Sequence, residues 1–158
     1  PFDAGVTFRP GARFGPLVLE QRLGAGAVHG LQPHQSHIPE RAVRAFSGGG
    51  AMPDWSVEAL SAPRPLLLLP RPETAEVVAL IPDGPPRQFR WRGVLHQVTG
   101  AQGPERIAPE WWRRTAEETR DYYLVEDTAG RRFWLYRAGL YGRGGDVMPQ
   151  WFVHGVWG

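Results

Sequence analysis

The stretch RDYYLVEDTAGRRFWLYR, residues 120–137, decides the fold. It holds two runs rich in aromatic and branched side chains, residues 121–126 and 132–137, and such runs are typical of β-strands. Residues 127–131 separate them, with Gly130 where a hairpin turn favours a left-handed backbone. The stretch therefore predicts an antiparallel β-hairpin.

The sequence on both sides of this hairpin repeats the strand pattern. Polar and aromatic residues alternate over 87–91, as in a half-buried strand, and residues 94–98 can return after Arg92 and Gly93. Further strands are predicted at residues 27–31, 64–70, 74–81 and 151–157, and short helices at residues 16–23 and 109–117. We expect a mainly β (α+β) fold, a small twisted antiparallel sheet or half-barrel with one or two short helices.

The composition predicts one β-rich domain, residues 64–158, preceded by a long loop-rich arm with a short helix, residues 1–63. The chain has 158 residues with 20 glycines and 16 prolines, and it has no cysteine, which excludes disulfides and thiolate metal sites. Its apolar runs, such as residues 66–69, are far too short for a bilayer, and no signal peptide is recognisable. We expect a cytoplasmic protein without membrane contact, and the initial Pro1 suggests a piece of a longer chain.

All 18 basic residues are arginines, and several of them lie on the predicted strands. Arginine stacks on aromatic rings and binds phosphate in a bidentate manner, as single-stranded nucleic acids require. Alternatively, the arginines form a solvated face while the alternating aromatics fill the core on the opposite side. The candidate nucleic-acid contacts are Arg87, Arg90, Arg92, Arg131, Arg132 and Arg137.

Histidines gather in the arm, where His29, His34 and His37 precede Glu40. Imidazole and carboxylate ligands suit zinc, but a proline-interrupted loop does not preset a ligand cage. Ser36, His37 and Glu40 include the residue types of a nucleophilic triad, yet neighbours on one loop seldom align for that chemistry. We therefore predict no metal site, no cofactor and no catalytic residue.

Trp111 and Trp112 stand side by side in a segment predicted as a short amphipathic turn. Adjacent residues on a helical turn point about 100° apart, so we expect one ring in the core and the other facing a second surface. Tryptophan and arginine are the types that dominate protein interfaces. The predicted partner-binding residues are Glu110, Trp111, Trp112, Arg113 and Arg114.

Six strings together carry a resemblance to a known family. They are SHIPERA at 36–42, RWRG at 90–93, GPERIAPEWW at 103–112, RDYY at 120–123, GRRFWLYR at 130–137 and WFVHG at 151–155. Together they resemble the C-terminal region of the ImuB family, bacterial homologues of Y-family DNA polymerases, over residues 15–158.

The resemblance implies a catalytically inactive adaptor in damage-induced mutagenesis and translesion DNA repair. Its implied partners are a RecA-like ImuA protein and an error-prone replicative-type polymerase subunit. Clamp binding is not expected, because no clamp-binding string of the Gln-x-x-Leu-Phe type is present. We therefore expect a non-catalytic interaction scaffold, with a module for single-stranded or primer-template DNA as the alternative. Homodimerisation through residues 151–157 as an edge strand is also open.

Overall fold

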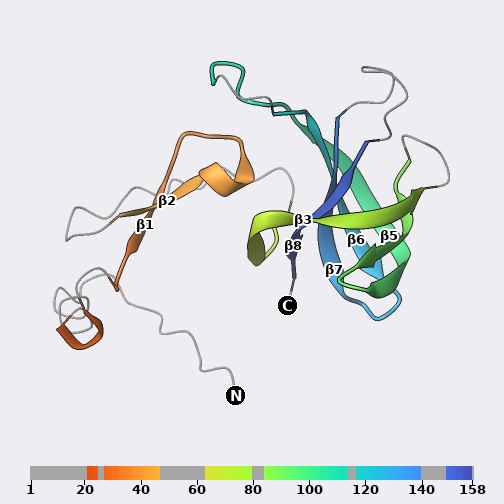
Figure 1. Cartoon of the computed structure of the whole chain (residues 1–158), viewed down its shortest axis with the longest axis horizontal. Coiled ribbons are helices and arrows are strands. Elements are labelled where there is room, and N and C mark those ends of the chain that lie inside the picture. Colours follow the sequence, from red (N-terminus) through yellow and green to blue (C-terminus); the bar gives the residue numbers. More distant parts are fainter. Residues whose placement is uncertain are drawn as a thin grey trace. The chain divides into compact units, whose positions relative to one another are not determined.

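The computed structural model describes residues 21–24, 27–46, 63–79, 84–113, 117–139 and 149–157 (Figure 1). The chain divides into two compact units, residues 1–36 with 41–56, and residues 37–40 with 57–158. In the first unit β1 (Gly30–Pro33) pairs antiparallel with β2 (Val43–Phe46). The domain boundary predicted at residue 63 stays a prediction, because residues 47–62 lie outside the described part.

The second unit contains a closed antiparallel barrel of six strands. Consecutive strands pair with each other, and the last strand pairs with the first (Figure 1). The strands are β3 (Leu67–Ala79), β4 (Pro86–Trp91), β5 (Val94–Ile107), β6 (Arg120–Asp127), β7 (Arg132–Ala138) and β8 (Trp151–Val156). The mainly β fold is thus confirmed, and the sheet closes completely where a sheet or half-barrel was expected.

The long strands β3 and β5 each pair with one neighbour along their first part and with a different neighbour along their second part. The first part of β3 pairs with β8 and the second with β4, and the register shifts between Leu68 and Glu73. Pro70 and Pro72 lie at this shift, where missing N–H groups are tolerated. The two strands predicted at 64–70 and 74–81 are therefore one bent strand over Leu67–Ala79.

Strand β5 behaves similarly, since it pairs with β4 up to Gln97 and with β6 from Val98 onward. It extends well past the predicted end at Val98. The helix predicted at 109–117 is wrong over its described part, because residues 109–110 are irregular, 111–113 form a turn and 117 is not helical, while 114–116 lie outside the described residues. Of the helix predicted at 16–23, only residues 21–23 are described, and they are helical.

The barrel interior holds one apolar cluster, to which alternate residues of each strand contribute. Phe89, Val125, Leu135 and Val153 are completely buried in it, together with Tyr123. The His96 ring stacks on Phe89, with ring centroids 4.6 Å apart. This cluster fixes the register of the strands, because a slip by one residue would turn every core side chain outward.

A second cluster lies on the outer wall of the barrel. Tyr122, Trp134 and Tyr136 alternate with the interior residues of β6 and β7 and so face the other side of the sheet, yet all three are buried. Ile38, which is only 2% exposed, packs into this cluster. Arg64 lies over the Trp134 ring at 5.0 Å and pairs with Glu105. Chain preceding the barrel therefore covers part of its wall.

Polar contacts hold residues 37–40, which include the start of η1 (Pro39–Arg41), against β6 and β8. The Arg120 guanidinium donates to both carboxylate oxygens of Glu40, at 2.9 and 3.1 Å. Glu40 also lies 3.8 Å from Nε2 of the buried His154, whose Nδ1 forms a hydrogen bond of 2.8 Å with the Tyr122 hydroxyl. An apolar side chain and an ion pair thus dock this turn together.

The described residues include no helix with the length and apolar character needed to traverse a membrane. They also exclude the edge-strand dimer, because β8 pairs with β7 on one side and with β3 on the other.

We expect stability to fall with acid in a window set by His154. Burial lowers the pKa of His154 from 6.5 to about 4, with the Arg120 charge acting in the same direction and the Glu40 carboxylate opposing it. Between these pH values the unfolded state binds more protons, so the free energy of unfolding decreases as the pH falls from 6.5 to 4, by up to about 1.4 kcal/mol per pH unit.

Denaturant titrations at several pH values measure this slope, and His154→Gln supplies the control. The free energy of unfolding of this variant should change less between pH 6.5 and 4 than that of the unaltered protein, whatever its absolute value. The same slope in both proteins would contradict the assignment to His154. Asp121, whose pKa lies below its usual 3.8, acts in a separate window at lower pH.

Candidate functional site

The segment that directly follows β5 projects beyond the end of the barrel (Figure 1). From Val98 to Ile107, β5 pairs with β6 alone among the described strands, which makes this part of the hairpin a ribbon. Residues 108–113, which we call the ribbon tip, follow β5 directly. Ile107, the last residue of β5, is buried in the outer-wall cluster, and the tip begins directly after it.

The ribbon tip is nonetheless an ordered turn. The backbone N–H of Arg113 donates to the carbonyl oxygen of Glu110 at 2.8 Å. The side chains of the same two residues form an ion pair of 2.6 Å, and the Glu110 carboxylate is completely buried. These contacts hold the turn with the Glu110 side chain buried, while Trp111, Trp112 and the Arg113 side chain face solvent.

Trp111 and Trp112 are therefore both exposed, by 86% and 56% respectively. Their rings meet edge to face, with centroids 5.7 Å apart and planes at 86°. The other described tryptophans, at positions 91, 134, 151 and 157, are buried or half-buried. The expectation that one ring enters the core was wrong, because the segment is the tip of a ribbon and not a helix lying on the barrel.

His37 lies beside the ribbon tip. Its ring meets Trp112 edge to face at 6.0 Å, and its Nε2 is 2.8 Å from the carbonyl oxygen of Ala108, 71 residues away. Sequence reasoning considered His37 only as a metal ligand or a base, and no local pattern announces so distant a neighbour. Among the described residues, no three His, Asp or Glu side chains gather as a metal ion would require.

Most of the candidate arginines are exposed but already engaged by acidic side chains. The pairs are Arg90–Glu76 at 3.5 Å, Arg92–Glu73 at 2.6 Å, Arg131–Asp127 at 2.7 Å and Arg132–Glu126 at 2.9 Å. The hydrogen bond from Arg92 lowers the pKa of Glu73, although burial opposes it. Arg87 is exposed as well. Each such carboxylate offsets the positive charge that a phosphate backbone would meet.

Arg137 is different, since it is only 2% exposed and lies inside the barrel end. Its Nη2 donates to Asp121 at 2.7 Å, and Arg106 binds the same carboxylate with two hydrogen bonds of 2.7 and 2.9 Å. Burial raises the pKa of Asp121, but the hydrogen bonds and charges of both guanidiniums outweigh it and leave that pKa lowered. Arg137 therefore belongs to the barrel structure, and we leave it out of any nucleic-acid surface.

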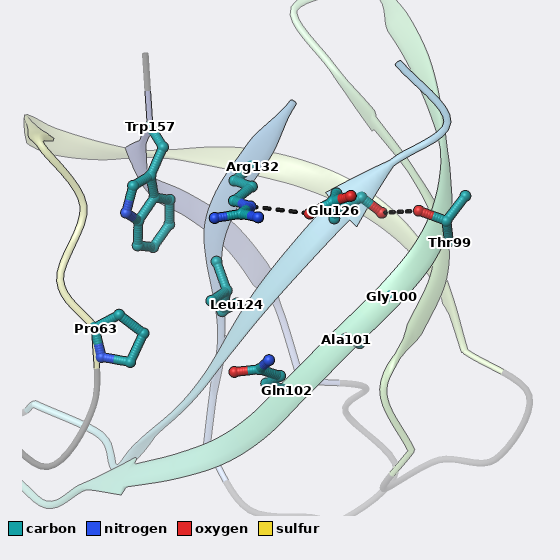
Figure 2. A pocket seen from close by; sticks show the side chains of 9 residues that line it. All are labelled: Pro63, Thr99, Gly100, Ala101, Gln102, Leu124, Glu126, Arg132 and Trp157. Atoms are coloured by element: carbon teal, nitrogen blue, oxygen red, sulfur yellow. Dashed lines mark hydrogen bonds and ion pairs between the residues drawn. The ribbon is translucent and has the colours of Figure 1, made fainter. Parts of the chain in front are cut away.

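A groove of about 510 Å³ runs over the outer wall at β5, β6 and β7 (Figure 2). Figure 2 shows Arg132 and Glu126 joined to each other across its floor, and Thr99 bonded to the backbone of Glu126. The lining residues are Pro63, Thr99, Gly100, Ala101, Gln102, Leu124, Glu126, Arg132 and Trp157. Its acidic and basic side chains neutralise each other, so the groove presents no converging set of acids or bases for catalysis.

Comparisons with known proteins give the family. No protein-family model matches the chain, and no solved structure matches it. Protein ImuB of Caulobacter vibrioides is 42% identical to it over 168 aligned positions in each of two strains, NA1000 / CB15N and ATCC 19089 / CIP 103742 / CB 15. The alignment covers 99% of this chain and 36% of ImuB, so the chain spans about a third of the length of the curated relatives it matches. Identity at this level along the whole sequence confirms the resemblance, and the chain belongs to the ImuB family, corresponding to its C-terminal region.

Proposed function

We propose that this chain is a non-catalytic protein-interaction module, the C-terminal scaffold of an ImuB-like subunit in a damage-induced mutagenic translesion DNA synthesis complex. Family membership supports the setting in DNA damage and mutagenesis. The proposed partners are a RecA-like ImuA protein and an error-prone replicative-type polymerase subunit. We assign no clamp binding to this region.

One observation carries the proposal: two neighbouring tryptophans are exposed at the ribbon tip. An indole presents a large apolar area, and covering it is favourable by about 25 cal/mol for each Å² removed from water. Tryptophan and arginine are enriched among the residues that dominate the binding energy of protein interfaces, each worth about 2 kcal/mol or more when central. The ribbon tip therefore fits a surface that a partner covers.

The turn also presents the rings in a defined arrangement. The Glu110–Arg113 ion pair and backbone hydrogen bond fix the turn before any partner arrives. A preorganised surface loses less conformational entropy on binding, so more of the apolar gain becomes affinity. Arg113 and Arg114 follow the two tryptophans in the sequence and belong to the proposed surface, with Arg114 lying outside the described residues.

We expect Trp111→Ala and Trp112→Ala each to weaken binding of the RecA-like partner by roughly 30-fold, the equivalent of about 2 kcal/mol. Both rings lie outside the apolar clusters, so the melting temperature should stay close to that of the unaltered protein. Calorimetric titration with the purified partner measures affinity, and circular dichroism measures melting.

Leu95→Ala provides the matched control, because Leu95 is an exposed apolar residue of β5 next to the β4–β5 turn, outside the ribbon. Its affinity should be unchanged. Unaltered partner binding by both tryptophan variants would remove the ribbon tip from the interface.

Direct nucleic-acid binding is the rival function, and salt dependence separates it from the proposal. Because the strand arginines pair with acids, we expect weak binding of a single-stranded oligonucleotide, with affinity changing little between Arg90→Gln and the unaltered chain. Gel shifts at 50 and 200 mM salt provide the measurement. Tight binding that drops steeply with salt and is lost in Arg90→Gln would favour the rival, since released counterions set that slope.

A further inference from the structure

We infer that His37 is a positioning residue that braces Trp112, so that the proposed partner site is assembled from two segments far apart in the sequence. This inference rests on the function proposed above. It adds to that function a residue outside the ribbon tip on which the geometry of the site depends.

His37 contacts the ribbon tip at two points, the Trp112 ring and the backbone of Ala108. The His37 and Trp112 rings meet edge to face, with centroids 6.0 Å apart and planes at 73°. The Nε2 atom of His37 lies at hydrogen-bond distance, 2.8 Å, from the carbonyl oxygen of Ala108, where the ribbon tip begins. One side chain thus holds the backbone entering the tip and the ring of one of its two exposed indoles.

His37 can brace the tip because its own neighbours are fixed to the barrel. Ile38 is buried in the outer-wall cluster with Tyr122 and Trp134. Glu40 is held by two hydrogen bonds from Arg120 on β6. The turn formed by residues 37–40 therefore transmits the rigidity of the barrel wall to a tip that otherwise joins the barrel through the ribbon.

The exposure of the two rings agrees with a contact from His37 to Trp112 alone. Trp112, which His37 contacts, is 56% exposed, whereas its neighbour Trp111 is 86% exposed. A side chain contributes more to affinity when neighbouring contacts already fix its rotamer, because less conformational entropy is lost on binding. Removal of such a contact weakens binding even though every residue that touches the partner is still present. His37 is then needed for the orientation of Trp112 and not for the stability of the barrel.

Fluorine NMR of the chain labelled with 5-fluorotryptophan tests the brace without any partner. The Trp112 resonance is identified by its disappearance in Trp112→Phe. In His37→Ala we expect this resonance to shift or broaden while the resonances of the buried tryptophans and the melting temperature stay unchanged. His29→Ala, which alters an exposed histidine of the other unit, serves as the control and should leave all of them in place.

Affinity for the RecA-like partner tests the consequence. His37→Ala should weaken binding about fivefold, as expected for the loss of one hydrogen bond and its ring contact. His37→Gln keeps a donor for Ala108 and His37→Phe keeps a ring beside Trp112, so each should recover part of the affinity. A purely structural role would change melting instead and would not show this graded recovery.

The outcomes separate the two claims. An unmoved Trp112 resonance in His37→Ala overturns the brace, and so does unchanged affinity in His37→Ala when the tryptophan variants bind weakly. If the tryptophan variants bind normally, the proposed interface is wrong, and the fluorine spectrum alone then decides whether His37 positions Trp112.

Discussion

The structure depends on the cover that two short segments provide for the outer wall of the barrel. Tyr122, Trp134 and Tyr136 point away from the barrel interior, where an uncovered sheet would leave them in water. Ile38 and Arg64 lie against this aromatic layer, and the Glu40–Arg120 ion pair secures one of the segments. The parts of β6 and β7 around Tyr122, Trp134 and Tyr136 are consequently buried on both faces, whereas Glu126 and Arg132 at the other end of the hairpin remain partly exposed.

This cover gives the barrel two unlike sides. Around Tyr122, Trp134 and Tyr136 the outer wall is aromatic and protected. The outer face of β3, β4 and β5 instead shows exposed residues such as Val78, Arg90 and Leu95. The ribbon tip with its two indoles is adjacent to the protected side, because the turn that protects the wall also carries His37. The same docking event therefore completes the second apolar cluster and sets the surroundings of Trp112.

The sequence predicted the strands well wherever local pattern and turn chemistry agreed. The hairpin at 120–137 is present nearly as expected, and so are β4 and β8, because alternating aromatics and a glycine turn leave few other arrangements. The helix at 109–117 failed because Pro109 and an amphipathic spacing suit a turn as well as a helix, and pairing of β5 with β6 decided between them. Closure of the barrel depends on the register shifts in β3 and β5, which no local pattern reveals.

The partner-binding residues stay a prediction, and their arrangement differs from the one expected from the sequence. Trp111, Trp112 and Arg113 do cluster, yet neither ring is buried, because burial depends on where the ribbon ends. Arg137 was predicted as a nucleic-acid contact together with Arg131 and Arg132, but its side chain is buried and donates a hydrogen bond to Asp121. The contact of His37 with the ribbon tip joins residues 71 positions apart, and only the docked turn brings them together.

The closing seam of the barrel has a mechanical consequence. Because β3 and β8 run antiparallel, with Leu67 opposite Val156, the polypeptide enters and leaves the barrel at the same place. A force that separates Leu67 from Val156 would load the hydrogen bonds between β3 and β8 one after another, starting at this end, instead of all at once in shear. Traction applied at Leu67 and Val156 would therefore open the barrel first at this seam.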